Sequence, residues 1–271
     1  MSSLSLRWWW LDRPGARVRG YTVGAGPPLL LLHGGRDNAR CWYEQLPVFA
    51  RSFRVIAFDA RAHGETRVFD GDYSTAAMVA DARAVLDAER AGRAAVIGYS
   101  MGAAVAVRLA LAAPERVSAL VLVGFGGNAD AARPQDVPAL RAAWERDQAL
   151  LREGGLAALL PRRLQRLFSP AFSAEAAERY CSAFLASDPS ELLRRPLPDL
   201  GIVDLAAVSA PTLVVAGEAD AVFSPQLGRA AAAQLPNARF VAIPGGHACH
   251  LESPALFNAV VEEFLASHVG G

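Results

Sequence analysis

The chain has 271 residues and no formal net charge, with 52% hydrophobic and 20% charged residues. This composition is that of a globular, core-forming protein, and without a basic cluster it excludes nucleic acid and anionic membranes as expected partners. Every basic residue is an arginine, which excludes a lysine nucleophile or a Schiff base.

The cysteines and the N-terminal stretch bear on where the protein works. Cys41, Cys181 and Cys249 lie far apart and form no C-x-x-C pair, so neither a disulfide framework nor a zinc knuckle is expected. The apolar run at residues 8–11 is too short for a signal-peptide core, and no stretch reaches the roughly 20 apolar residues of a membrane span. We therefore expect a soluble, cytoplasmic protein with no membrane partner.

Short apolar runs alternate with helical patterns through the first 127 residues. Strands are predicted at residues 5–11, 17–23, 28–32, 55–58, 94–97 and 120–123. Helices are predicted at residues 41–50, from a Ser74 or Thr75 cap to residue 91, and at 101–113. In the first strand, period-two alternation places Trp8 and Trp10 on one face and Trp9 on the other.

This alternation stops between about Asn128 and Val208. The segment has helical stripes but no convincing strand, and we expect prolines to cut it into short helices. These prolines are Pro134, Pro138, Pro161, Pro170, Pro189, Pro196 and Pro198. An all-helical insertion between two strands predicts a lid. We expect its many arginines on a solvated face, with contact to a carboxylate as the alternative.

The strand–helix rhythm resumes with strands at 212–216 and 239–243 and helices at 225–235 and 254–267. Such alternation predicts an α/β fold, with a mostly parallel sheet and right-handed crossovers. Ligands of these sheets bind at the carboxyl ends of the strands. His33, Asp59, Ser100, Asp220 and His247 all lie just past the carboxyl end of a predicted strand.

One pentapeptide, Gly98-Tyr99-Ser100-Met101-Gly102, joins an apolar strand to an alanine-rich helix. G-x-S-x-G in this setting is the arrangement of a nucleophile elbow. The turn is so sharp that Ser100 is expected to have a positive φ, and the flanking glycines remove side chains that would collide there. Ser100 is therefore the candidate nucleophile.

A serine hydroxyl is a weak nucleophile at neutral pH, so it needs a general base, and the base needs an orienting carboxylate. His247 and His250 both follow the last strand, and His247 is preferred because two glycines before it let the backbone approach the sheet. For the carboxylate, Asp220 is preferred to Glu218, which lies only two residues past its strand. The order Ser100, Asp220, His247 is the one that accompanies this elbow.

Acyl transfer also needs hydrogen-bond donors aimed at the developing oxyanion. The backbone N–H of Met101, directly after the serine, is one candidate. The loop after residues 28–32 reads His33-Gly34-Gly35, and the N–H of Gly35 is the second candidate. A simple tight turn is the alternative reading of these two glycines.

These motifs together resemble the α/β-hydrolase superfamily over nearly the whole chain. The matching stretches are 31–34, Asp59-x-Arg61-x-His63-Gly64, 98–102, 211–215 with Gly217-x-x-Asp220, and Gly246-His247 with Glu252-x-Pro254. The resemblance implies an eight-stranded, mostly parallel sheet flanked by helices, with a core of residues 1–127 and 209–271 and a helical cap at 128–208. It also implies a Ser–His–Asp triad that uses no metal and no cofactor.

The resemblance assigns loop-holding roles to His33, Asp59 and Arg61. Two positions depart from the family pattern: Ala62 and Ala103 stand where glycine is common. Both are small, so the catalytic expectation holds. Dehalogenases and epoxide hydrolases of this fold carry aspartate at the elbow, and the serine here argues against them.

We therefore expect a serine hydrolase, monomeric or homodimeric, that cleaves a carboxylic ester, thioester or lactone of a small molecule through an acyl-enzyme. Hydrolysis of a carbon–carbon bond in a diketone, on the same triad, is one alternative. A non-catalytic small-molecule binder of the same fold is another. The candidate pocket residues are Gly34, Tyr99, Phe125, Trp144, Tyr180 and Phe184. The alternative is that these residues pack inside the lid or the core.

Overall fold

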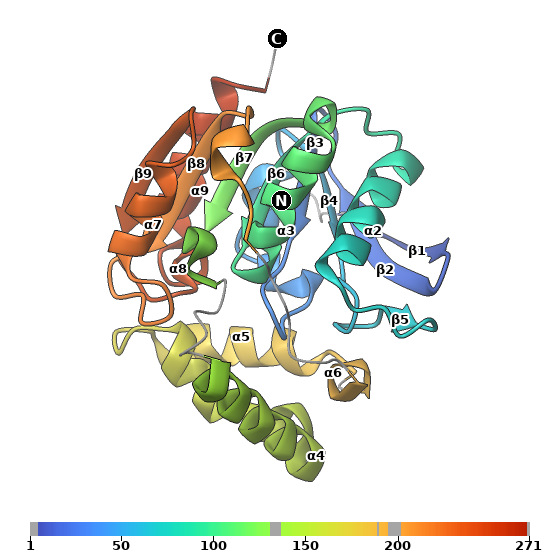
Figure 1. Cartoon of the computed structure of the whole chain (residues 1–271), viewed down its shortest axis with the longest axis vertical. Helices are drawn as coiled ribbons and strands as arrows, with labels where there is room; N and C mark the ends of the chain where they lie inside the picture. Colours follow the sequence, from blue (N-terminus) through green and yellow to red (C-terminus); the bar gives the residue numbers. More distant parts are fainter. Residues whose placement is uncertain (1–4, 131–136, 189, 195–201, 270–271) are drawn as a thin grey trace.

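The structure, a computed structural model, describes residues 5–130, 137–188, 190–194 and 202–269 (Figure 1). Its strands are β1 (Arg7–Arg13), β2 (Ala16–Val23), β3 (Pro28–Leu32), β4 (Arg54–Phe58), β5 (Arg67–Val68), β6 (Ala94–Tyr99), β7 (Val117–Val123), β8 (Thr212–Gly217) and β9 (Ala238–Ile243). They form one sheet in the order β1-β2-β4-β3-β6-β7-β8-β9, with the short β5 paired to β2. Pairing is antiparallel from β1 to β4 and parallel from β4 to β9. The predicted α/β fold, with an eight-stranded and mostly parallel sheet, is confirmed, and β5 adds an unpredicted edge piece.

Most helix bounds lie close to the predicted ones. The helices are α1 (Leu46–Phe49), α2 (Thr75–Ala88), α3 (Met101–Ala112), α4 (Val137–Leu167), α5 (Ala174–Leu185), α6 (Ser190–Arg194), α7 (Pro225–Ala232), α8 (Cys249–Glu252) and α9 (Pro254–Ala266). The predicted helix at 41–50 is wrong: a 3₁₀ turn (Ala39–Trp42) capped by Asn38 precedes the separate α1. Pro47 lies in the first turn of α1. Because it has no N–H to bond to the preceding turn, a new helix begins here instead of a longer one continuing.

The strands divide their side chains between two cores, one on each face of the sheet. In β3, Leu29 and Leu31 point into the core covered by α1, α8 and α9, while Leu30 and Leu32 point into the core covered by α2, α3 and α7. Successive strand residues face opposite sides, so a strand covered on both faces is apolar throughout. Trp8 packs against the first core and Trp9 against the second, as the alternation predicts.

Helices α4, α5 and α6 lie between β7 and β8 in the chain. Figure 1 shows them together, below the sheet and its flanking helices in that view. The expectation that Pro161 ends a helix is wrong: α4 consists of two helical stretches that meet at Gly154 and Gly155, and Pro161 lies inside the second. The backbone bends instead at Gly154 and Gly155, where glycine permits the φ of +63° found at the second position. Pro134, Pro189, Pro196 and Pro198 lie outside the described residues.

Candidate active site

The elbow between β6 and α3 has the strained backbone that its sequence predicts. Ser100 has φ +51° and ψ −114°, and its N–H donates to the carbonyl of Val123 over 2.8 Å. A Cβ on Gly98 would lie 2.4 Å from the carbonyl oxygen of Gly102, and one on Gly102 would lie 2.1 Å from that of Leu32. Both positions therefore need glycine, and the serine is held at the start of α3.

A chain of hydrogen bonds links this serine to a histidine and an aspartate. The Nε2 atom of His247 lies 2.9 Å from Ser100 Oγ, and its Nδ1 lies 2.8 Å from Asp220 Oδ2. The other oxygen of Asp220 accepts the N–H groups of Val222 and Phe223 at 2.7 and 2.9 Å. These bonds fix the carboxylate of Asp220, which accepts the N–H of the imidazole at Nδ1. The lone pair of Nε2 then faces the serine hydroxyl.

The competing base and acid lie elsewhere. His250 is fully buried, with its ring 4.5 Å from that of Tyr99 and 5.1 Å from that of Trp42. Burial, with a smaller contribution from the nearby His247, lowers the pKa of His250 to about 3. Glu218 is exposed at the end of β8. The structure thus brings His247 and Asp220 to the serine and leaves the two competitors out.

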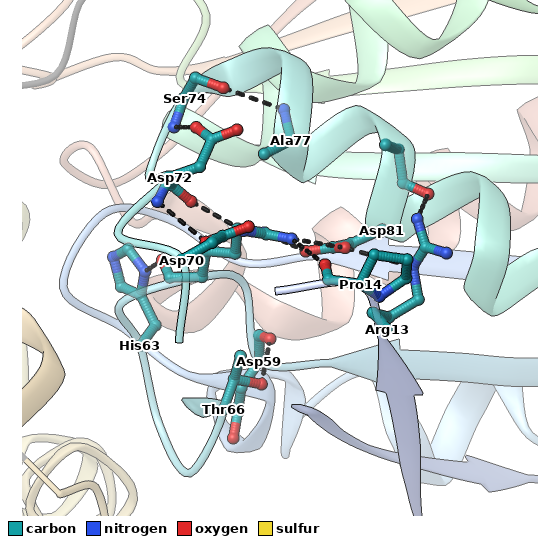
Figure 2. A network of polar contacts seen from close by, with 12 residues as sticks. Arg13, Pro14, Asp59, His63, Thr66, Asp70, Asp72, Ser74, Ala77 and Asp81 are labelled. Atoms are coloured by element: carbon teal, nitrogen blue, oxygen red, sulfur yellow. Dashed lines mark hydrogen bonds and ion pairs between the residues drawn. The ribbon is translucent and has the colours of Figure 1, made fainter. Parts of the chain in front are cut away.

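The loop after β4 contains a polar network, part of which Figure 2 shows. Asp59 accepts the N–H groups of Ala39 and Glu65 at 2.7 and 2.9 Å, and burial raises its pKa to about 6. The guanidinium of Arg61 lies 2.7 Å from Asp81, which is on α2. These contacts fit the loop-holding roles implied by the family resemblance.

His33 makes contacts of the same kind. Its Nε2 accepts the N–H of Ala60 at 2.9 Å, and its Nδ1 lies 2.8 Å from the carbonyl of Gly34. The ring packs edge-on against His63, with 5.0 Å between centroids. His33 therefore joins the loops after β3 and β4.

The two candidate oxyanion donors belong to neighbouring residues. Met101 is the first residue of α3, and a Cβ on Gly35 would lie 3.9 Å from the Cβ of Met101. A Cβ on Gly34 would lie 2.6 Å from the ring of Tyr99, so this position needs glycine. The tight-turn alternative also holds, because Gly34 accepts the N–H of Asp37 over 3.1 Å.

Arg163 of α4 is part of the site's surroundings that the sequence did not predict. Its Nη1 donates to the carbonyl of Gly35 at 3.2 Å, its Nη2 lies 3.0 Å from Asp37, and its Nε donates to the Tyr180 hydroxyl at 2.8 Å. The Tyr180 hydroxyl in turn donates to Asp37 over 3.2 Å. Arg163 is only 9% exposed, so the expected solvated face is wrong for this arginine. The buried carboxylate of Asp37 requires a counter-charge there.

A sequence signal for Arg163 does exist. It lies on the same stripe of α4 as the buried Leu156, Leu159 and Leu167, at helical spacing. A charged residue on an apolar stripe indicates a buried partner. By contrast, the neighbouring Arg162 is 47% exposed.

The aromatic residues predicted for the pocket are mostly in packed positions. Tyr99, Phe125, Tyr180 and Phe184 are each at most 4% exposed. Phe125 belongs to the core under α2, α3 and α7, whereas the ring of Tyr99 lies 5.3 Å from that of His247. Trp144 is partly buried under an arginine side chain of the loop after β3. Contact between these residues and a substrate stays a prediction.

A family model described as alpha/beta hydrolase fold matches residues 27–254. The chain belongs to this family. The loop after β3, the elbow and the loops carrying Asp220 and His247 all lie within the matched region. Among the described residues, no helix of this family member is long and apolar enough to cross a membrane.

Known members of the α/β-hydrolase family align over most of this chain. BpoC of Mycobacterium tuberculosis, a candidate non-heme bromoperoxidase, is 31% identical, covering 90% of this chain and 95% of BpoC. The 3-oxoadipate enol-lactonase 2 of Acinetobacter baylyi is 26% identical, covering 88% of each chain. A thermophilic esterase from Thermogutta terrifontis is 27% identical with a TM-score of 0.81, covering 99% of this chain and 100% of the esterase. The protein is therefore a hydrolase of this fold.

Proposed function

We propose that the protein is a serine hydrolase that cleaves a carboxylic ester, thioester or lactone of a small molecule through an acyl-enzyme. The observation that carries this proposal is the hydrogen-bond chain from Asp220 through His247 to Ser100, with distances of 2.8 and 2.9 Å. The esterase and the lactonase among its relatives support an acyl substrate.

The proposed reaction starts at Ser100. Its oxygen attacks the acyl carbonyl carbon while His247 takes the hydroxyl proton, and the N–H groups of Met101 and Gly35 stabilise the oxyanion. The intermediate then breaks its bond to the leaving group, which receives the proton from the imidazolium. Water, deprotonated by His247, attacks the acyl-enzyme, and the serine leaves with that proton. Acylation and deacylation each return the histidine to its neutral form.

We also propose that residues 128–208, which include α4–α6, form a cap on a core of residues 1–127 and 209–271. Three hydrogen bonds near the candidate site support this assignment. Asn38 donates to the carbonyl of Ala183 at 2.9 Å and to the hydroxyl of Ser187 at 2.7 Å. Ala248, next to His247, donates to the carbonyl of Leu167 at 2.9 Å. A substrate bound between cap and core would lie beside the triad.

The test is a hydrolysis screen of p-nitrophenyl esters, lactones, acyl thioesters and diketones with the wild-type protein and Ser100→Ala. We expect ester or lactone turnover, lowered by about 10⁴–10⁶-fold in Ser100→Ala. Ser267→Ala, at the exposed end of α9, is the matched control and should keep full activity. A fluorophosphonate probe should label the wild type once, at Ser100.

Two results would contradict the proposal. Full esterase activity of Ser100→Ala would exclude this serine as the nucleophile. Absence of both turnover and labelling in the wild type would favour a non-catalytic binder, and turnover of the diketone alone would favour the carbon–carbon hydrolase.

A further inference from the structure

Residues 35–38, in the loop after β3, contact α4 or the end of α5 at each of the four positions. Gly35 and Asp37 bind Arg163, and Asn38 binds the end of α5, as described above. Arg36 lies 4.8 Å above the ring of Trp144 and 3.1 Å from the carboxylate of Asp147, both on α4. This loop carries one of the two proposed oxyanion donors.

The turn within this loop determines where the N–H of Gly35 points. The carbonyl of Gly34 accepts the N–H of Asp37 at 3.1 Å. That carbonyl and the N–H of Gly35 belong to one trans peptide group, so they point in opposite directions. Because Nδ1 of His33 also lies 2.8 Å from this carbonyl, the groups that hold Asp37 orient the N–H of Gly35 together with His33.

Two consecutive glycines give this turn little rigidity of its own. Arg163 binds on both sides of Arg36, at the carbonyl of Gly35 and at the carboxylate of Asp37. The Tyr180 hydroxyl closes the network, because it accepts from Arg163 and donates to Asp37. The side chains of Asp37, Arg163 and Tyr180 are all buried, and a buried ion pair contributes little net stability but fixes geometry.

We infer that Arg163 is a positioning residue for the second oxyanion donor: through Gly35 and Asp37 it holds the N–H of Gly35 in place for the tetrahedral intermediate. This inference rests on the proposed function, since it concerns the same acyl-transfer site. The cap, through this arginine, then completes the oxyanion hole as well as covering it. A displaced donor lowers the rate constant of the chemical step more than it weakens ground-state binding.

The test compares Arg163→Met and Arg163→Lys with a matched control, Arg179→Met. Arg179 of α5 also bridges to the core, but its ion pairs are with Glu44, at 3.1 Å, and with Glu175 of its own helix. In Arg163→Met we expect kcat for a p-nitrophenyl ester to fall about 10 to 100-fold, with little change in KM. Arg163→Lys keeps the charge near Asp37 without the fork and should be intermediate, and Arg179→Met should equal the wild type.

Two further readouts separate positioning from a merely structural role. A thiono ester, whose sulfur accepts hydrogen bonds poorly, measures use of the oxyanion hole, so its rate relative to the oxygen ester should rise in Arg163→Met. Backbone amide hydrogen exchange in a peptide spanning residues 33–42 should accelerate in Arg163→Met and not in Arg179→Met.

An unchanged kcat, or a lowered kcat with an unchanged preference for the oxygen ester, would overturn the inference. Unchanged exchange in residues 33–42 would overturn it as well. Failure of the proposed function gives a different result, because the wild type would then hydrolyse no ester, while hydrogen exchange would still decide whether Arg163 holds the loop. Should Arg163→Met fail to fold, Arg163→Lys decides by the same three readouts.

Discussion

Two buried arginines, Arg61 and Arg163, hold loops after the neighbouring strands β4 and β3, but they reach their partners differently. Arg61 binds Asp70 and Asp81, which follow it within 20 residues of chain. Arg163 binds Gly35 from 128 residues away. The first network is contained within the core, whereas the second depends on how α4 packs against the core. The comparison indicates that one loop is held by residues close to it in the chain and the other by α4, which is distant in the chain.

Arg61→Met gives the largest expected effect on stability. Asp81 is 1% exposed, so removal of its close partner leaves a buried carboxylate poorly compensated, and the free energy of unfolding should fall by about 3–5 kcal/mol. Urea denaturation measures this loss, and kcat of the folded protein should remain that of the wild type.

Arg13→Met is the matched control for Arg61→Met. Arg13 also approaches Asp81, but at 3.4 Å and with a more exposed side chain, so its loss should be small. A large fall of kcat in Arg61→Met without loss of stability would contradict this prediction. Arg61 would then influence the active site, as Arg163 is inferred to do.

His250 sharpens the comparison, since it is a buried titratable group with no ion pair. Within the part of the chain that the structure describes, neither of its ring nitrogens has a hydrogen-bond partner. Its pKa is about 3 when folded and near 6.5 when unfolded, so the unfolded chain binds a proton that the folded chain does not. Stability is therefore lost as the pH falls from 6.5 toward 3, by about 1.4 kcal/mol per pH unit.

His250→Leu should remove this dependence. Between pH 7 and pH 5, the wild type should lose about 2 kcal/mol more of its free energy of unfolding than the variant does. Asp59, whose pKa burial raises to about 6, shifts acid stability in the opposite direction in both proteins and cancels from the difference. Parallel pH profiles of the two proteins would contradict the prediction.

Two N-cap serines, with the smallest expected effects, test whether α2 and α5 unfold together. The hydroxyl of Ser74 accepts from Ala77 at the start of α2, and that of Ser173 accepts from Ala176 at the start of α5. Replacement of either serine by alanine should cost about 1 kcal/mol. Hydrogen exchange should show the loss from Ser173→Ala in the amides of α5 and not in those of α2. An equal loss in both helices would show one cooperative unit.

Local patterns in the sequence were enough to predict most of the fold and the elbow. The apolar run of β3 predicts a strand covered on both faces, and the flanking glycines predict the positive φ of Ser100, because these features depend only on near neighbours. The split at Pro47 and the continuation of the second part of α4 through Pro161 were missed. In both cases, a single proline was given the wrong weight relative to the residues around it.

The candidate site shows the same division. Chain order and strand ends were enough to choose Asp220 and His247, since parallel strands bring their carboxyl ends to one edge. The burial of Arg163 was not predicted, because whether a helical arginine is solvated depends on which surface the helix meets. The competing histidine, His250, was set aside on sequence grounds, but only the structure shows that it is buried among aromatic rings.

The sequence by itself determined the α/β fold, the elbow around Ser100, and the order of the three candidate triad residues. These depend on periodicity and short-range sterics, which a linear chain already contains. Only the tertiary structure decided that Asp37, Arg163 and Tyr180 form one buried network beside Gly35. A buried charge pairs with the group that packing brings within hydrogen-bond distance, and local sequence patterns do not predict which group that is.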